Sequence, residues 1–294
     1  MSTAPRHLPD FIAVGPPRTA TTWLHEVLKD RVGLPANIKE TDFFTRFYDR
    51  GIDWYANYFA HCDGSTPVGE IGPMYFASPD ARERIARDLP QCKIIFSFRD
   101  PVERAYSNYR LLRRIVSMKS DFETAATTRG DLLESSRYGT HLESWLKSFG
   151  RECALILIYD DLEANPQAFL DSICDFIGIA RFPISATQVG AERVNTVSTQ
   201  PPNPRLAKMA RAVVAWFAEH HYHRAAGRVR ESRIIKFMLE GGDPFPPLSD
   251  DVVRRMREFY RPEIEKLEKL TGRDLSVWKF GQKQTMAVST MASE

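Results

Sequence analysis

Small hydroxyl side chains and one arginine follow the first apolar run of the chain. Residues 11–15 read FIAVG, and residues 16–24 read PPRTATTWL. Backbone N–H groups at the start of a helix, together with hydroxyl and guanidinium groups, bind phosphate-like anions. The pattern therefore predicts a loop that holds an anionic group of a ligand. Its predicted contacts are Arg18, Thr19, Ala20, Thr21 and Thr22.

The loop lacks the lysine that ATP-binding phosphate loops carry. When the pattern G-x-x-x-x-G-K-[ST] is placed on Gly15, Ala20 stands at the position of the second glycine and Thr21 at the position of the lysine. That lysine reaches the β- and γ-phosphates of a nucleoside triphosphate. The next apolar run ends as IIFSFRD, so Arg99 stands where a magnesium-binding aspartate is expected. We therefore expect a phosphate site without Mg²⁺.

Arg99 indicates a second anion site, at the end of the next strand. Ser107 lies seven residues after Asp100, two turns along the following helix and on one face of it, so its hydroxyl can reach the same anion. The alternatives are a surface ion pair of Arg99 with Asp100 or Glu103 and, for the first loop, an ordinary tight turn. Because both positions follow apolar strands, each supports the other.

Alternating strands and helices must position these residues. Continuous apolar runs predict buried strands at residues 11–15, 92–98 and 153–159. Helical spacing and capping residues predict helices at 21–30, 79–89, 101–115, 139–149 and 166–177. This order is typical of an α/β fold, a three-layer sandwich with a central parallel sheet and a P-loop-like phosphate-binding loop. A helical C-terminal extension is expected to follow.

Length and composition indicate one folded domain. The chain has 294 residues, of which 43% are hydrophobic and 27% charged, and this excludes global disorder. We expect a single domain over 1–280, mostly loop and helical extension from 182 to 280, and a disordered tail at 281–294. The net charge of +2 excludes nucleic-acid binding by bulk electrostatics.

The cysteines and the apolar segments indicate in which cellular compartment the protein works. Four widely spaced cysteines without a C-x-x-C pair fit free thiols, buried at Cys92 and Cys153, in a reducing environment. No run of about 18 apolar residues and no signal-peptide pattern occur, so we expect a cytoplasmic protein without a membrane span. Histidines at 220, 221 and 223 lack partner ligands at metal-site spacing, and no metal is predicted.

Two segments resemble the sulfotransferases that use 3′-phosphoadenosine 5′-phosphosulfate (PAPS). GPPRTATTWL is similar to their 5′-phosphosulfate loop, and RDPVERAYSNY to their 3′-phosphate-binding segment. KETDFF, GIDWYANYF, RYGTHLESWLKSF and LILIYDDLEANP resemble the branch with heparan sulfate N- and 3-O-sulfotransferases and many bacterial enzymes. The resemblance covers about residues 10–180. It implies PAPS as cofactor, adenosine 3′,5′-bisphosphate (PAP) as product, and transfer without a metal.

The resemblance also implies catalytic roles. Glu40 corresponds to the base that takes the proton of the acceptor, and Arg18 to the cation at the 5′-phosphate and bridging oxygen. Lys39 is expected to tune Glu40 or to contact the sulfonate. Arg193 is a candidate contact of the 3′-phosphate. Without the resemblance, Lys39 and Glu40 fit a solvated turn beside buried aromatic residues.

The acceptor is only broadly predicted. Heparan-type members often carry a lysine where GEIGPMY has Ile71. Its absence weakens the prediction of a heparan-type substrate. Glu70 of this segment is either structural or a second acidic group near the acceptor. The aromatic residues at 43–59 favour an acceptor with an apolar part. The basic residues between 205 and 236 form a solvated face or meet an anionic acceptor, a carrier protein or a membrane surface.

The predicted function is sulfuryl transfer from PAPS to a hydroxyl group of a small molecule, lipid or carbohydrate. Transfer to an amine is the less favoured reaction. Two alternatives stay open, a P-loop-type nucleotide or small-molecule kinase and a non-catalytic anion-binding scaffold. The kinase predicts Mg²⁺-dependent ATP binding, whereas the scaffold predicts PAP binding without turnover, or no binding.

Overall fold

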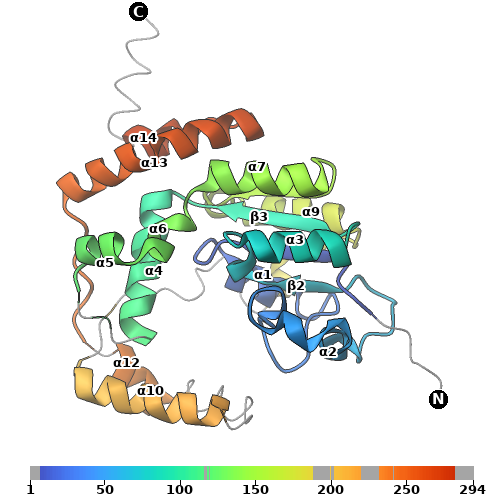
Figure 1. The fold of residues 1–294 in the computed structure, drawn as a ribbon, viewed down its shortest axis with the longest axis horizontal. Coiled ribbons are helices and arrows are strands. Elements are labelled where there is room, and N and C mark those ends of the chain that lie inside the picture. The colour runs from blue at the N-terminus through green and yellow to red at the C-terminus, as the bar shows by residue number, and fades with distance from the viewer. Residues whose placement is uncertain are drawn as a thin grey trace, which may run out of the picture. The chain divides into compact units, whose positions relative to one another are not determined.

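A parallel sheet lies at the centre of the fold (Figure 1). The computed structural model describes residues 7–115, 118, 120–187, 199, 202–219, 232–240 and 242–281. Within them the sheet has the strand order β2-β1-β3-β4, and all neighbouring strands are parallel. The strands are β1 (Phe11–Gly15), β2 (Gly69–Ile71), β3 (Lys93–Phe98) and β4 (Ala154–Ile158). The α/β fold predicted from the sequence is confirmed.

Helices cover both faces of the sheet. On one face, Phe11 and Ala13 of β1 belong to a core cluster that also contains Trp23 of α1 and Leu170 of α9. On the other face, aromatic rings of β3 pack against α7, where the ring centroids of Phe96 and Trp145 lie 5.9 Å apart. The flanking helices are α1 (Thr21–Leu28), α3 (Pro79–Asp88), α7 (Tyr138–Phe149) and α9 (Pro166–Ile177).

Capping residues begin and end these helices as the sequence predicts. The Ser78 hydroxyl accepts the N–H of Ala81 at 3.2 Å and begins α3. Asp100 caps α4 (Pro101–Ile115) by accepting the N–H of Val102 at 2.8 Å. Gly178 ends α9 in the left-handed conformation.

Short helical pieces fill the connections. They are η1 (Phe43–Phe47), η2 (Tyr48–Arg50), α2 (Ile52–Ala56), η3 (Asn57–Phe59), η4 (Pro73–Tyr75), α5 (Phe122–Thr128), α6 (Gly130–Glu134), α8 (Tyr159–Ala164) and η5 (Ile184–Ala186). All four cysteines are free thiols, with Cys92 and Cys174 buried and Cys153 half-buried. No helix in the described ranges combines the length and apolar character needed to cross a bilayer.

The chain forms two compact units. Unit 1 comprises Met1–Arg104, Glu134–Val194 and Asp250–Glu294 and contains the sheet. Unit 2 comprises Ala105–Leu133 and Asn195–Ser249. Its helices α10 (Pro204–Glu219) and α12 (Arg233–Glu240) pack through a small apolar cluster that includes Ala207, Ala210, Ile235 and Leu239.

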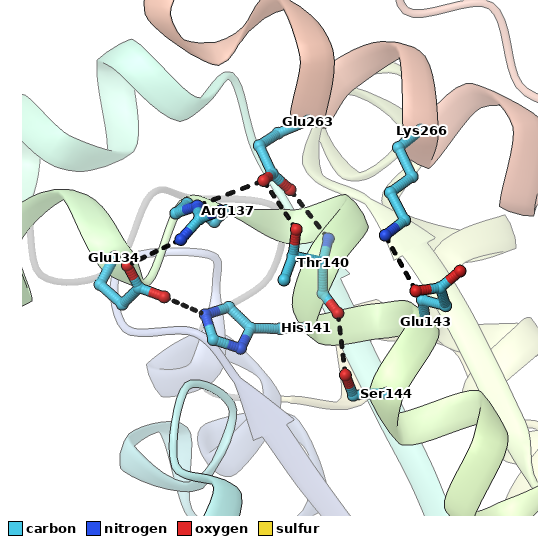
Figure 2. A network of polar contacts seen from close by, with 8 residues as sticks. All are labelled: Glu134, Arg137, Thr140, His141, Glu143, Ser144, Glu263 and Lys266. Atoms are coloured by element: carbon cyan, nitrogen blue, oxygen red, sulfur yellow. Dashed lines mark hydrogen bonds and ion pairs between the residues drawn. The ribbon is translucent and has the colours of Figure 1, made fainter.

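The last helices of the described chain belong to unit 1. α13 (Asp250–Thr271) lies along α7, and α14 (Ser276–Phe280) follows it. Glu263 accepts hydrogen bonds from the Thr140 N–H at 2.8 Å and from the Thr140 hydroxyl at 2.7 Å (Figure 2). Lys266 donates to Glu143 at 2.9 Å. A Cβ added to Gly139 would lie 2.7 Å from the Glu263 carbonyl oxygen, so α7 and α13 approach closely only because residue 139 is glycine.

Candidate active site

The loop between β1 and α1 is held in an anion-binding shape. Arg18 and Ala20 are left-handed, with φ of 76° and 73°. Left-handed residues in a loop turn backbone N–H groups toward one concave side. Between them, buried Thr19 donates its hydroxyl to the Pro16 carbonyl at 2.7 Å, and Ser97 of β3 donates to the Thr19 carbonyl. The loop is therefore fixed before any ligand binds.

Gly15 allows the loop to pass close to a neighbouring segment. It has a φ of +80°, and an added Cβ would lie 2.9 Å from the Cβ of Pro73 and 3.1 Å from Thr21. Any side chain would have to displace the start of η4 or the first residue of α1. The observed loop thus needs glycine at position 15, for conformation and for space.

Lys39 joins the phosphate loop to the predicted base. Its ammonium group lies 3.0 Å from the Thr22 hydroxyl and 3.0 Å from Oε1 of Glu40. The side chains of Lys39 and Glu40 are 30% and 31% exposed. The carboxylate therefore stands beside the first turn of α1 and can be reached from solvent.

Glu70 anchors the segment that carries these two residues. It is fully buried at β2 and accepts hydrogen bonds from the hydroxyl of Thr41 at 2.5 Å, of Tyr55 at 2.5 Å and of Tyr75 at 3.0 Å. The backbone N–H of Thr41 donates to it as well, at 3.1 Å. Burial raises the pKa of Glu70, while these donors act in the opposite direction. Of the two roles considered for Glu70, its contacts support the structural one.

Asp42 brings a second carboxylate to the same turn. It is left-handed, with a φ of 53°, and its Oδ1 is buried without a hydrogen-bond partner among the described residues. Burial raises the pKa of Asp42; Arg46 opposes this rise and the charge of Glu40 adds to it. Arg46 lies 3.8 Å from Oδ2 of Asp42 and Lys39 lies 3.0 Å from Oε1 of Glu40, so each carboxylate of the turn faces a cation.

Arg99 lies at the end of β3 and is held by two neighbours. Its guanidinium donates to Oε2 of Glu103 at 2.7 Å and 3.2 Å and stacks 4.7 Å above the ring of Tyr159. Tyr138 donates its hydroxyl to the Arg99 carbonyl at 2.9 Å. The ion pair with Glu103 was one alternative from the sequence, and it fixes the guanidinium at the carboxyl edge of the sheet.

The two predicted anion sites share one edge of the sheet. β1 and β3 are paired neighbours, with Gly15 opposite Phe96. Half-buried Arg18 follows β1 by three residues, and Arg99 follows β3 directly. Ser107 is buried in α4, in the part that belongs to unit 2. Arg193 lies outside the described residues.

Two supporting residues were not predicted from the sequence, namely Ser97, which holds the phosphate loop, and Thr41, which holds the turn at Glu40. The polar residue inside IIFSF was the available signal for Ser97. Tyr159 was expected at the carboxyl end of its strand, and the structure adds that it stacks on Arg99. The described side chains contain no group of three or more His, Cys, Asp or Glu that could hold a metal ion. The histidines at 220, 221 and 223 lie outside that part of the chain.

The sulfotransferase domain family matches residues 8–197, well over half of the chain. The chain belongs to this sulfotransferase family. It is 27% identical over 281 residues to the heparan sulfate glucosamine 3-O-sulfotransferase 3B1 of Homo sapiens, covering 92% of this chain and 65% of that protein. It is 31% identical over 196 residues to the bifunctional heparan sulfate N-deacetylase/N-sulfotransferase 4 of Mus musculus, covering 59% and 22%. This sulfotransferase thus spans less than two thirds of either relative.

A solved structure shares the fold. The sulfotransferase of Alicyclobacillus acidocaldarius superposes with a TM-score of 0.65 at 19% identity, over 93% of this chain and 99% of that one. The family resemblance seen in the sequence is confirmed, and family membership implies PAPS as sulfate donor. The fixed loop with its left-handed residues and Arg18, and Arg99 at the same sheet edge, suit a ligand with two separate anionic groups.

Proposed function

We propose that this sulfotransferase transfers the sulfuryl group of PAPS to a hydroxyl group, with Glu40 as the general base. The observation that carries the proposal is the bridge made by Lys39. Its ammonium contacts Thr22 of the phosphate loop and Glu40, both at 3.0 Å. The bridge supports a base held next to the loop that grips the transferred group.

The side chains suit an in-line displacement. Bound PAPS supplies a sulfuryl group on a phosphate leaving group. Glu40 takes the proton of the acceptor hydroxyl through Oε2, because Lys39 engages Oε1. The acceptor oxygen forms a bond to sulfur as the bond between sulfur and the bridging oxygen breaks, and the electron pair passes to the phosphate. Arg18 and the loop N–H groups stabilise the charge that develops there.

The acceptor that we propose has an apolar part. Phe43 and Phe44 are fully buried, whereas Phe47 and Met74 present apolar surface to solvent. Both relatives are named for heparan sulfate, and the name of the 3-O-sulfotransferase supports a sugar hydroxyl as the acceptor group. A carbohydrate with an aglycone, a lipid or a small molecule would satisfy both observations.

Titration calorimetry with PAP tests the donor half of the proposal. Binding of PAP that is indifferent to EDTA, with weaker binding of ATP, is the expected result. Binding of ATP that requires Mg²⁺ would favour the kinase alternative. Incubation of PAPS with a metabolite extract, read by mass spectrometry, tests turnover. PAP binding without any sulfonated product would instead favour the non-catalytic scaffold.

A further inference from the structure

One face of α10 presents apolar side chains to solvent. Leu206, Met209, Val213 and Trp216 follow one another at intervals of three and four residues, so they form one stripe along the helix. Met209 is 61% exposed and Trp216 is 51% exposed. An exposed stripe of this kind marks an interaction surface, because scattered single residues would be the ordinary case.

The stripe is separate from the surface that holds α10 and α12 together. Ala207 and Ala210 of α10 are buried against Ile235 and Leu239 of α12. α12 adds exposed apolar residues of its own, since Ile234 is 73% and Phe237 63% exposed. Each helix therefore has an inner apolar face that builds the pair and an outer one that the pair leaves exposed.

Basic charge is concentrated in the same segment. Residues 205–236 contain eight basic and two acidic residues, whereas the whole chain carries a net charge of only +2. The remainder of the chain is therefore net negative. Arg205 and Lys208, next to the stripe, and Arg233 of α12 are exposed. An apolar stripe that contains tryptophan and is flanked by cations matches a surface with an anionic outer layer and an apolar interior.

We propose that the α10–α12 pair docks on an anionic phospholipid bilayer. The stripe residues enter the boundary between headgroups and acyl chains, and the basic side chains contact lipid phosphates. An acidic protein partner is the alternative occupant, and it would bind without any dependence on vesicles. The inference does not depend on sulfuryl transfer; if both hold, the enzyme works on acceptors at a membrane surface.

Vesicle co-sedimentation tests the proposal on the full chain. Phosphatidylcholine vesicles that contain phosphatidylglycerol should bind the protein, pure phosphatidylcholine vesicles should not, and high salt should weaken binding. The double variant Met209→Ser/Trp216→Ser should lower the lipid affinity by at least about tenfold. The matched control is Phe259→Ser, an equally exposed apolar residue of α13 in unit 1, which should bind like the wild type.

A charge test separates the two components of binding. Arg205→Glu/Lys208→Glu should abolish the preference for anionic vesicles, while Lys147→Glu, an exposed charge reversal on α7, should keep it. Brominated lipids should quench tryptophan fluorescence in the wild type and far less in Trp216→Phe. Trp23, Trp145 and Trp278 are buried and Trp54 is half-buried, so Trp216 is the main reporter.

Three outcomes would overturn the proposal. The first is no binding to phosphatidylglycerol vesicles at low salt, with PAP binding intact. The second is binding that the stripe variants leave unchanged. The third is a concentration-dependent dimer that disappears in the Met209→Ser/Trp216→Ser variant, which would assign the stripe to a second copy of the chain. Circular dichroism of each variant verifies that the helices remain folded.

Discussion

Thr41 donates its hydroxyl to the fully buried carboxylate of Glu70 across 2.5 Å. The same hydroxyl accepts the N–H of Phe43 at 3.2 Å. Thr41 directly follows Glu40 in the chain, so the position of the predicted base depends on this pair. Glu70 is best described as a positioning residue, because it reaches the reaction only through the segment that it holds.

Thr41→Val should therefore impair turnover more than donor binding. The variant keeps the shape of the side chain but removes the hydroxyl, leaving Glu70 with one donor fewer. We expect kcat to fall by about tenfold or more, stability to fall by about 1–3 kcal/mol, and the Kd for PAP to stay unchanged. Steady-state kinetics, urea unfolding and calorimetry measure the three quantities.

Thr45→Val is the matched control for this variant. Its hydroxyl bonds the Asp42 carbonyl at 3.2 Å and does not contact Glu70. An equal loss of kcat in both variants would show that the Thr41–Glu70 pair has no special role in positioning Glu40.

Glu40→Gln should reduce kcat by about 10²–10⁴-fold, because the amide cannot accept the proton of the acceptor. PAP affinity should stay within about twofold, since donor contacts are unchanged. Glu83→Gln on α3 removes a highly exposed carboxylate and serves as control. A rate equal to that of the control would remove Glu40 from the mechanism.

Arg18→Ala and Arg99→Ala should each weaken PAP binding by about 2–3 kcal/mol, roughly 30- to 150-fold, because each removes a charge-assisted contact. Calorimetry at two salt concentrations measures the effect. Arg87→Ala, an exposed arginine of α3, controls for general loss of positive charge. If Arg99→Ala binds PAP like this control, the second anion site lies elsewhere.

The raised pKa of Asp100 predicts that the stability of the fold depends on pH. Burial raises the pKa of this helix cap to about 6, from an ordinary 3.8, despite Arg257 at 3.9 Å. The folded chain therefore binds the proton more tightly than the unfolded chain, and the contribution of Asp100 to stability declines as pH rises through about 4 to 6. Asp100→Asn keeps a capping oxygen, so it should become more stable relative to wild type by up to about 3 kcal/mol over this window.

Urea unfolding at several pH values measures the Asp100 effect. Asp121→Asn is a control of opposite sign, because Asp121 caps α5 in an exposed position and its pKa is lowered by the Thr124 N–H. If Asp100→Asn and wild type differ by the same amount at every pH, Asp100 does not titrate in this range.

Local patterns predicted the parts of the fold that local sequence determines. Continuous apolar runs gave β1, β3 and β4, and Ser78 and Asp100 marked helix starts. β2 was missed because three residues are too few to show a periodicity, and only Ile71 among them favours a strand. The pieces of five residues or fewer between 43 and 59 are too short for a helical repeat to appear.

The residues of the candidate site likewise fall into those that one local segment predicts and those that only the folded sheet brings together. The phosphate loop is contiguous, so its residues could be named from the sequence. Contacts such as Lys39 with Thr22, or Arg99 with Tyr159, join residues far apart in the chain and depend on the packed sheet. The sequence predicts an extension over 182–280, whereas the structure groups Ala105–Leu133 with Asn195–Ser249. No local pattern reports a pairing of that kind.

The close passage of α13 along Gly139 has a practical consequence for protein engineering. The family match ends at residue 197, yet α7 relies on Glu263 and Lys266, which come more than sixty residues later. A chain shortened to the matched region would leave α7 without these partners. Unit 1, which contains the sheet, includes Asp250–Glu294 as its last segment, so such a shortened chain would also lack part of the unit that carries the site.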